Sequence, residues 1–182
     1  MAGMIIFRKA VAGLNDTVLA KFTARAQRNI GLRGEVSILV AGNDELQALN
    51  ARFRGQPRPT DVLSFPAMSR AAGLAGDLAI SADLAALNAK RLGHTTAEEI
   101  KILILHGLLH LAGYDHEQDQ GEMGRQELRL RRRLHLPGGL IERHHPQDAS
   151  KLKVLVARGR AVASKRQRRT RAAARTAGHK TR

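Results

Sequence analysis

The segment KILILHGLLHLAG, residues 101–113, decides the fold of this chain. Between Ile102 and Gly113 its only polar side chains are His106 and His110, which lie four residues apart. In a helix this spacing puts both rings on one face, about one turn apart. A helix that is apolar nearly all round belongs at the centre of a domain, covered on several sides. The segment therefore predicts a buried central helix that presents two imidazoles.

A third histidine, His116, follows shortly after the predicted end of this helix at Gly113. A turn at the glycine would return His116 to the first two rings. Three imidazoles with an open fourth position suit a catalytic Zn²⁺ ion, and they also suit Ni²⁺ or Cu²⁺. The alternative is a set of ordinary core histidines, but burying an unpaired imidazole costs about 1–3 kcal/mol. We therefore expect His106, His110 and His116 to bind one zinc ion.

The composition narrows the protein class. The 182 residues suffice for one domain with a core of its own. The chain has no cysteine, which excludes disulfides and thiolate metal sites and fits a reducing compartment. It also has no apolar run of about 18 residues and no segment that resembles a signal peptide. These features predict a cytoplasmic protein that does not span a membrane.

The net charge of +15 is concentrated at the C-terminus. Residues 151–182 hold twelve of the 31 Lys and Arg residues and no Asp or Glu, so the rest of the chain has 19 basic against 16 acidic residues. Such a basic block is often disordered and binds polyanions, although it can equally be a solvated extension. We expect a folded domain over residues 1–148 and a disordered basic tail over 149–182.

Hydrophobic periodicity predicts an α+β domain. Short strands are expected near residues 4–7, 35–41, 62–65 and 76–80, with a loop over 68–75. Helices are expected over 16–31, from Asn43, over 82–92, from a capping box at Thr95 or Thr96, and over about 121–134. In the first helix the predicted buried stripe is Val18, Phe22, Ala26 and Ile30. In the last helix it is Met123, Leu130 and Leu134.

Three segments resemble one known family. HGLLHLAGYDH (residues 106–116) is similar to the H-x3-H-x5-H signature of the YbeY family of bacterial rRNA-processing endoribonucleases. LNARFRGQPRPTDVLSFP (residues 49–66) resembles the upstream motif of that family, and GDLAIS (residues 76–81) resembles its GD-plus-strand motif. Their order and rough spacing also agree. The resemblance covers about residues 35–135 and leaves the basic tail without a counterpart.

The resemblance implies a single domain with a mixed sheet of about four strands, packed with helices, and a zincin-like metal helix. It implies a zinc-dependent endoribonuclease specific for single strands, which matures the 3′ end of the small-subunit rRNA and acts in ribosome quality control. Arg54 would be the catalytic basic residue. The partners would be rRNA and the small subunit, with a ribosomal protein or a GTPase as further candidates. Without the resemblance, the sequence predicts that Arg54 is an ordinary surface arginine at the end of a helix.

One departure from the zinc proteases is informative. Proteases with an H-E-x-x-H helix place a Glu directly after the first histidine as general base, whereas Gly107 occupies that position here. Peptide hydrolysis by that route is therefore not expected. Asp115 has two possible roles: its carboxylate orients a histidine, or the residue belongs to the turn. The nearby Gly113 favours the role in the turn.

Two other functions stay open from the sequence. One is a ribosome-assembly or RNA-binding factor whose zinc is mainly structural, and the other is a metallohydrolase of another substrate. With one Tyr, four Phe and no Trp, stacking platforms for bases are expected to be few, so base-specific recognition is not expected.

Overall fold

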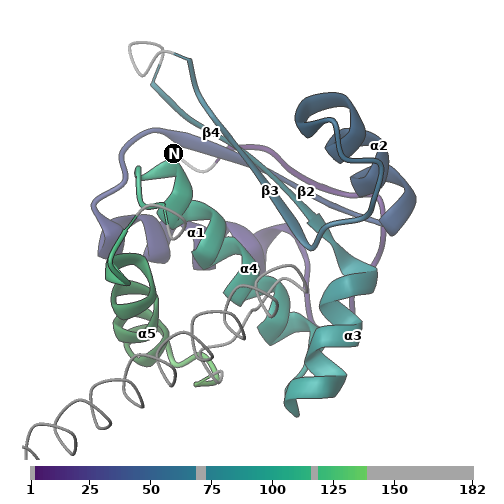
Figure 1. Ribbon diagram of the computed structural model, residues 1–182. Coiled ribbons are helices and arrows are strands. Elements are labelled where there is room, and N and C mark those ends of the chain that lie inside the picture. The colour runs from purple at the N-terminus through teal and green to yellow at the C-terminus, as the bar shows by residue number, and fades with distance from the viewer. Residues whose placement is uncertain (1–2, 69–72, 116–118, 139–182) are drawn as a thin grey trace, which may run out of the picture. The chain divides into compact units, whose positions relative to one another are not determined.

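Helix α4 (Thr96–Leu111) is the centre of the fold in the computed structural model, which describes residues 3–68, 73–115 and 119–138 (Figure 1). A capping box opens this helix. The Thr95 hydroxyl accepts a hydrogen bond from the Glu98 backbone N–H at 3.2 Å, and the Glu98 carboxylate accepts one from the Thr95 N–H at 2.8 Å. The Thr95 backbone N–H thereby holds the pKa of Glu98 below its ordinary value. The predicted capping box is confirmed at Thr95.

Four strands and four further helices surround α4 in the part of the chain that the structure describes. The strands are β1 (Ile5–Phe7), β2 (Glu35–Ala41), β3 (Val62–Pro66) and β4 (Leu74–Ser81). The helices are α1 (Asp16–Ile30), α2 (Asn43–Arg54), α3 (Ala82–Leu92) and α5 (Glu122–Leu134). Side chains cap two of them, since Asn15 accepts from the Val18 N–H and Ser81 accepts from the Leu84 N–H.

The strands form one mixed sheet in the order β1-β2-β4-β3. Strands β1, β2 and β4 run parallel, and β3 pairs antiparallel with β4 at the edge. The predicted α+β fold with a mixed sheet of about four strands is therefore confirmed.

The sheet buries a different set of helices on each face. Alternate residues of a strand point to opposite faces, so Ile38 of β2 and Leu78 of β4 join the core that α1, α4 and α5 cover. On the other face, Leu63 of β3 and Ala79 of β4 form a smaller cluster with Leu46 of α2. Figure 1 shows α2 on one side of the strands, with α4 and α5 on the other. Residues on α2 and on α4 are thus separated by the sheet.

Close packing of α4 on the sheet depends on Gly107. A Cβ atom placed at Gly107 would lie 2.7 Å from one terminal methyl of Leu78 and 3.2 Å from the Ser64 hydroxyl oxygen. Leu78 is 1% exposed, so the methyl has little room to move away. The glycine therefore lets the histidine-bearing turn of α4 approach β3 and β4.

Two local expectations differ from the structure. In α1 the buried residues are Leu19, Thr23, Ala26 and Gln27, and Val18, Phe22 and Ile30 lie beside this stripe rather than in it. A strict repeat of four residues drifts by about 40° per step around a helix of 3.6 residues per turn, so it cannot stay on one face. Strand β4 begins at Leu74 rather than at residue 76 because its pairing with β2 continues to the Glu35–Leu74 pair. The three predicted buried residues of α5 are confirmed.

The predicted tail, residues 149–182, lies outside the described residues, so the boundary at residue 148 stays a prediction. Among the described helices, none combines the length and the apolar character that crossing a bilayer requires.

We predict that Gly107→Ala lowers the free energy of unfolding by about 1–3 kcal/mol, because the added methyl overpacks the contact with Leu78. The matched control is Gly124→Ala in α5, where a Cβ meets nothing within 4 Å and the expected change is a gain of up to about 1 kcal/mol. Urea denaturation of both variants measures the difference. Equal stability of the two variants would contradict the packing argument.

Candidate functional site

His106 and His110 are the only side chains between Ile102 and Leu111 that are not fully buried. They lie one turn apart on α4, with ring centroids 4.8 Å apart and ring planes at 76°. Their Nε2 atoms approach each other to 3.2 Å. The predicted pairing of the two rings on one helix face is therefore present, and it opens the apolar core to the surface at this point.

The other nitrogen of each ring is held by an acceptor. His110 Nδ1 lies 3.0 Å from the Tyr114 carbonyl oxygen, and His106 Nδ1 lies 2.9 Å from Glu127 Oε2. A carbonyl oxygen and an ionised carboxylate can only accept, so both Nδ1 atoms carry the proton and donate. In the neutral rings both Nε2 atoms then present lone pairs toward the same point. A metal ion between the two nitrogens would accept both lone pairs, and a proton on one Nε2 would also join them.

The spacing of the two nitrogens fits a metal ion. A tetrahedral zinc ion with Zn–N bonds of about 2.0–2.1 Å separates two of its nitrogen ligands by about 3.3 Å. The Nε2 atoms of His106 and His110 are 3.2 Å apart. The third expected ligand, His116, lies outside the described residues. Within the described ranges alone, no three His, Asp or Glu side chains gather to form a metal site.

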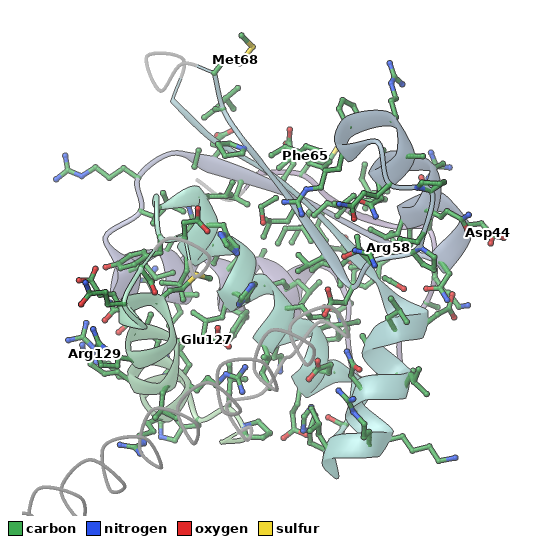
Figure 2. All side chains as sticks on the ribbon, in the orientation of Figure 1. Asp44, Arg58, Phe65, Met68, Glu127 and Arg129 are labelled. Atoms are coloured by element: carbon green, nitrogen blue, oxygen red, sulfur yellow. The ribbon has the colours of Figure 1, made fainter. Side chains whose placement is uncertain are left out.

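Glu127 of α5 is a site residue that the sequence reasoning missed. Its Oε2 accepts from His106, and its Oε1 accepts from the guanidinium of Arg131, which is 8% exposed. Figure 2 shows Glu127 on the side of α5 that faces α4, whereas Arg129 points away from it. The sequence did contain an indication of Glu127. It follows Met123 by four residues and precedes Leu130 by three, so it lies on the buried face of α5.

The turn after α4 contains Asp115, which was predicted either to orient a histidine or to form part of the turn. Its carbonyl oxygen accepts from the Asp119 N–H at 2.9 Å, which makes Asp115 part of the turn that leads to α5. Asp119 in turn accepts from the Gly121 and Met123 N–H groups at the start of α5. The carboxylate that contacts His106 is that of Glu127.

Comparison with known proteins assigns the family. The family model described as "Endoribonuclease YbeY" matches residues 6–135. The chain belongs to the YbeY family. A relative named "Endoribonuclease YbeY" from Koribacter versatilis is 54% identical over 140 residues, which cover 77% of this chain and 91% of the relative. A second relative with this name, from Solibacter usitatus, is 47% identical over 76% of this chain and 92% of its own length.

A solved structure agrees with this assignment. The solution structure of TM1509 from Thermotoga maritima matches with a TM-score of 0.53 and 28% identity, over 74% of this chain and 89% of that chain. The fold of this YbeY-family chain is therefore shared with an experimentally determined structure.

Arg54 and the histidines come from different helices in this YbeY-family fold. It is the last residue of α2, and its side chain is exposed. Helix α2 packs against β3, β4 and α3, on the face of the sheet opposite α4. The packing of the two helices therefore does not bring Arg54 beside His106 or His110, and its predicted catalytic role stays a prediction.

The position next to His106 explains why a protease-type base is missing. A glutamate at residue 107 would need space that Leu78 and Ser64 already fill. The carboxylate that is near the histidines, Glu127, has one oxygen on His106 and the other on Arg131. Neither position supplies a free general base.

We predict that Glu127→Ala changes the tautomer of His106 in the metal-free protein, because the ring loses the acceptor that keeps the proton on Nδ1. Nitrogen-15 NMR of the imidazole rings reports the protonated atom directly. Glu122→Ala, an exposed acidic residue on the same helix, should leave the His106 signals unchanged. Unchanged His106 signals in Glu127→Ala would show that the carboxylate does not set the tautomer.

Proposed function

We propose that this chain is a zinc-dependent endoribonuclease that cleaves single-stranded RNA during rRNA maturation. The observation that carries the proposal is the pair of Nε2 atoms at 3.2 Å, with each Nδ1 held by an acceptor. Membership of the YbeY family supplies the substrate class, because the relatives are named endoribonucleases. His106, His110 and His116 would hold the ion.

A zinc ion held by three imidazoles supplies a Lewis acid and lowers the pKa of a bound water to about 7. The chain's own residues prepare that site. Glu127 keeps His106 in the tautomer that points Nε2 outward, and the Tyr114 carbonyl does the same for His110. Arg131 fixes Glu127 in turn, so α5 holds one ligand of the site in place.

Arg54 is the proposed contact to the scissile phosphate. Negative charge develops on the equatorial oxygens of phosphorus during hydrolysis, and a guanidinium offers paired donors to such oxygens. RNA also carries its own nucleophile, the 2′-hydroxyl. Its attack on phosphorus would break the bond to the 5′-oxygen of the next nucleotide, which leaves as a hydroxyl after taking up a proton, and would form a 2′,3′-cyclic phosphate. This route needs no protein nucleophile and would confine the enzyme to RNA. It is consistent with Gly107 at the position where a protease carries its base.

The finer role that we propose is maturation of the 3′ end of the small-subunit rRNA and quality control of ribosomes in the cytoplasm. The partners would be the small subunit with a ribosomal protein or a GTPase, and the basic residues of 149–182 would contact polyanions. The competing function is a ribosome-assembly factor in which the metal only holds the fold. Catalysis of RNA cleavage distinguishes the two.

We predict that the full-length protein binds one zinc ion and that His110→Ala abolishes tight binding. Glu127→Ala should weaken zinc binding about 10- to 100-fold, because the outer partner of a histidine ligand orients the ring and raises its basicity. Competition with a chromophoric chelator measures the affinity. Glu122→Ala is the matched control and should bind as the wild type does. A Glu127→Ala variant with wild-type affinity would remove α5 from the proposed site.

We predict that the zinc-loaded protein cleaves a single-stranded RNA that contains the small-subunit 3′ end, and that His110→Ala does not. Arg54→Ala should bind zinc normally and cleave about 10²- to 10³-fold more slowly, the usual loss when one donor to a developing charge is removed. The exposed Arg33 provides the control variant Arg33→Ala. Equal cleavage by the wild type and His110→Ala would identify a contaminating nuclease and favour the assembly factor. Turnover of a peptide would favour a different hydrolase.

A further inference from the structure

Phe53 exposes an aromatic ring near the end of α2. Its side chain is 57% exposed, and it is the only aromatic among the large exposed apolar residues of the described chain. Phe65 of β3 lies beside it, with ring centroids 5.1 Å apart and planes at 66°. This edge-to-face contact fixes the Phe53 ring. The composition predicts few stacking platforms, yet the fold brings two of the four Phe residues together at the surface.

One guanidinium lies over this ring, and two further arginines are close to it in the sequence. The guanidinium carbon of Arg52 lies 5.3 Å from the centroid of Phe53, and Arg54 follows directly in the last turn of α2. Arg58 comes next along the chain. The acidic residues of α2, Asp44 and Glu45, are in its first turn, and Figure 2 shows Asp44 at the far end of the helix from Phe65. The aromatic end of α2 is therefore cationic.

The turn that carries Arg58 is tied to α2 by side chains. Asn50, which is 2% exposed, donates from Nδ2 to the Arg58 carbonyl at 2.8 Å. Gln47 donates to the Pro57 carbonyl at 3.1 Å. Two prolines further limit the backbone of this turn. A ligand that binds here would find the aromatic ring and the backbone of the turn already positioned, which lowers the entropic cost of binding.

We propose that Phe53, with Arg52 and Arg58, forms a subsite for single-stranded RNA in which a base stacks on the Phe53 ring, next to the phosphate contact proposed for Arg54. Every base has a π-face, so this contact is tolerant of sequence, and the arginines neutralise the adjacent phosphates. A protein partner would instead need a broad apolar patch, whereas the guanidinium of Arg52 lies over this ring. The proposal rests on RNA being the substrate, as argued above.

The place of the subsite in the fold gives it a role in binding. It lies on the α2 face of the sheet, whereas His106 and His110 lie on α4 on the other face. RNA that contacts both must cross the edge strand β3. Phe53 would contact a base rather than the cleaved phosphodiester, so this contact should stabilise substrate and transition state alike. Its loss should raise KM and leave kcat nearly unchanged.

Tryptophan substitution provides a direct test, because the chain contains no Trp. Full-length Phe53→Trp should show fluorescence quenching on addition of a 12-nucleotide oligoadenylate, in buffer with EDTA to prevent cleavage. The same RNA backbone without bases should quench little. The control is Leu87→Trp on α3, which is 62% exposed at the wild-type leucine and should respond to neither RNA. Equal quenching at both positions, or by both RNAs, would overturn the proposal.

Affinity measurements complete the test. Phe53→Ala should weaken binding of the oligoadenylate about 5- to 100-fold, and Phe53→Leu should not restore it, since leucine keeps apolar area but lacks a π-face. Leu87→Ala should bind as the wild type does. Arg52→Ala should reduce the salt dependence of binding by about one phosphate contact. Wild-type affinity in Phe53→Ala, or full rescue by leucine, would reject base stacking. Because no cleavage is measured, quenching at residue 53 would stand even if the chain proved not to be a nuclease.

Discussion

The burial of α4 is the constraint on which the rest of the structure depends. Seven of its apolar side chains are completely inaccessible to solvent, which requires a cover on nearly every side: Ile100, Ile102, Leu103, Ile104, Leu105, Leu108 and Leu109. Strands β3 and β4 supply one side, and α1, α3 and α5 supply the others. Between Ile102 and Leu111, only the side chains of His106 and His110 are partly exposed. Helix α4 therefore anchors the core, and between Ile102 and Leu111 its only polar side chains, His106 and His110, face the surface.

Helix α5 shows how a covering element also becomes part of the site. Met123, Leu130 and Leu134 bury its apolar stripe, and Glu127 occupies the remaining position of that stripe. A carboxylate there would be costly without partners, but His106 takes one oxygen and Arg131 takes the other. Glu127 thus links the packing of α5 to the orientation of His106. The stability of this helix and the geometry of the site are therefore coupled.

Much of the fold followed from local patterns in the sequence. The capping box at Thr95, the four strands and the apolar central helix depend on neighbouring residues, and the structure confirms them. The spacing of His106 and His110 is local too, since it lies within one helical turn. The predicted buried stripe of α1 is right at Ala26, but it misses Leu19, Thr23 and Gln27 because a repeat of four residues approximates the helical period only over a short stretch.

Contacts between distant segments could not be read in this way. Glu127 lies 21 residues from His106, and only the docking of α5 on α4 brings the two together. The pairing of Phe53 with Phe65 likewise needs the turn after α2 to return the chain along the edge of the sheet. The sequence motif places Arg54 beside Phe53 but carries no information on the face of the sheet to which α2 packs.

The two faces of the sheet impose a specific demand on a substrate. The candidate metal ligands lie on α4, and the arginines and Phe53 lie on α2, with β3 as the edge strand between these layers. A ligand that contacts both the histidines and the end of α2 has to pass around the edge of the packed sheet. A flexible, extended polyanion can do so by passing around the edge, because its backbone bends and each nucleotide offers both a phosphate and a base. This division of groups between two faces is consistent with the extended RNA substrate that we propose.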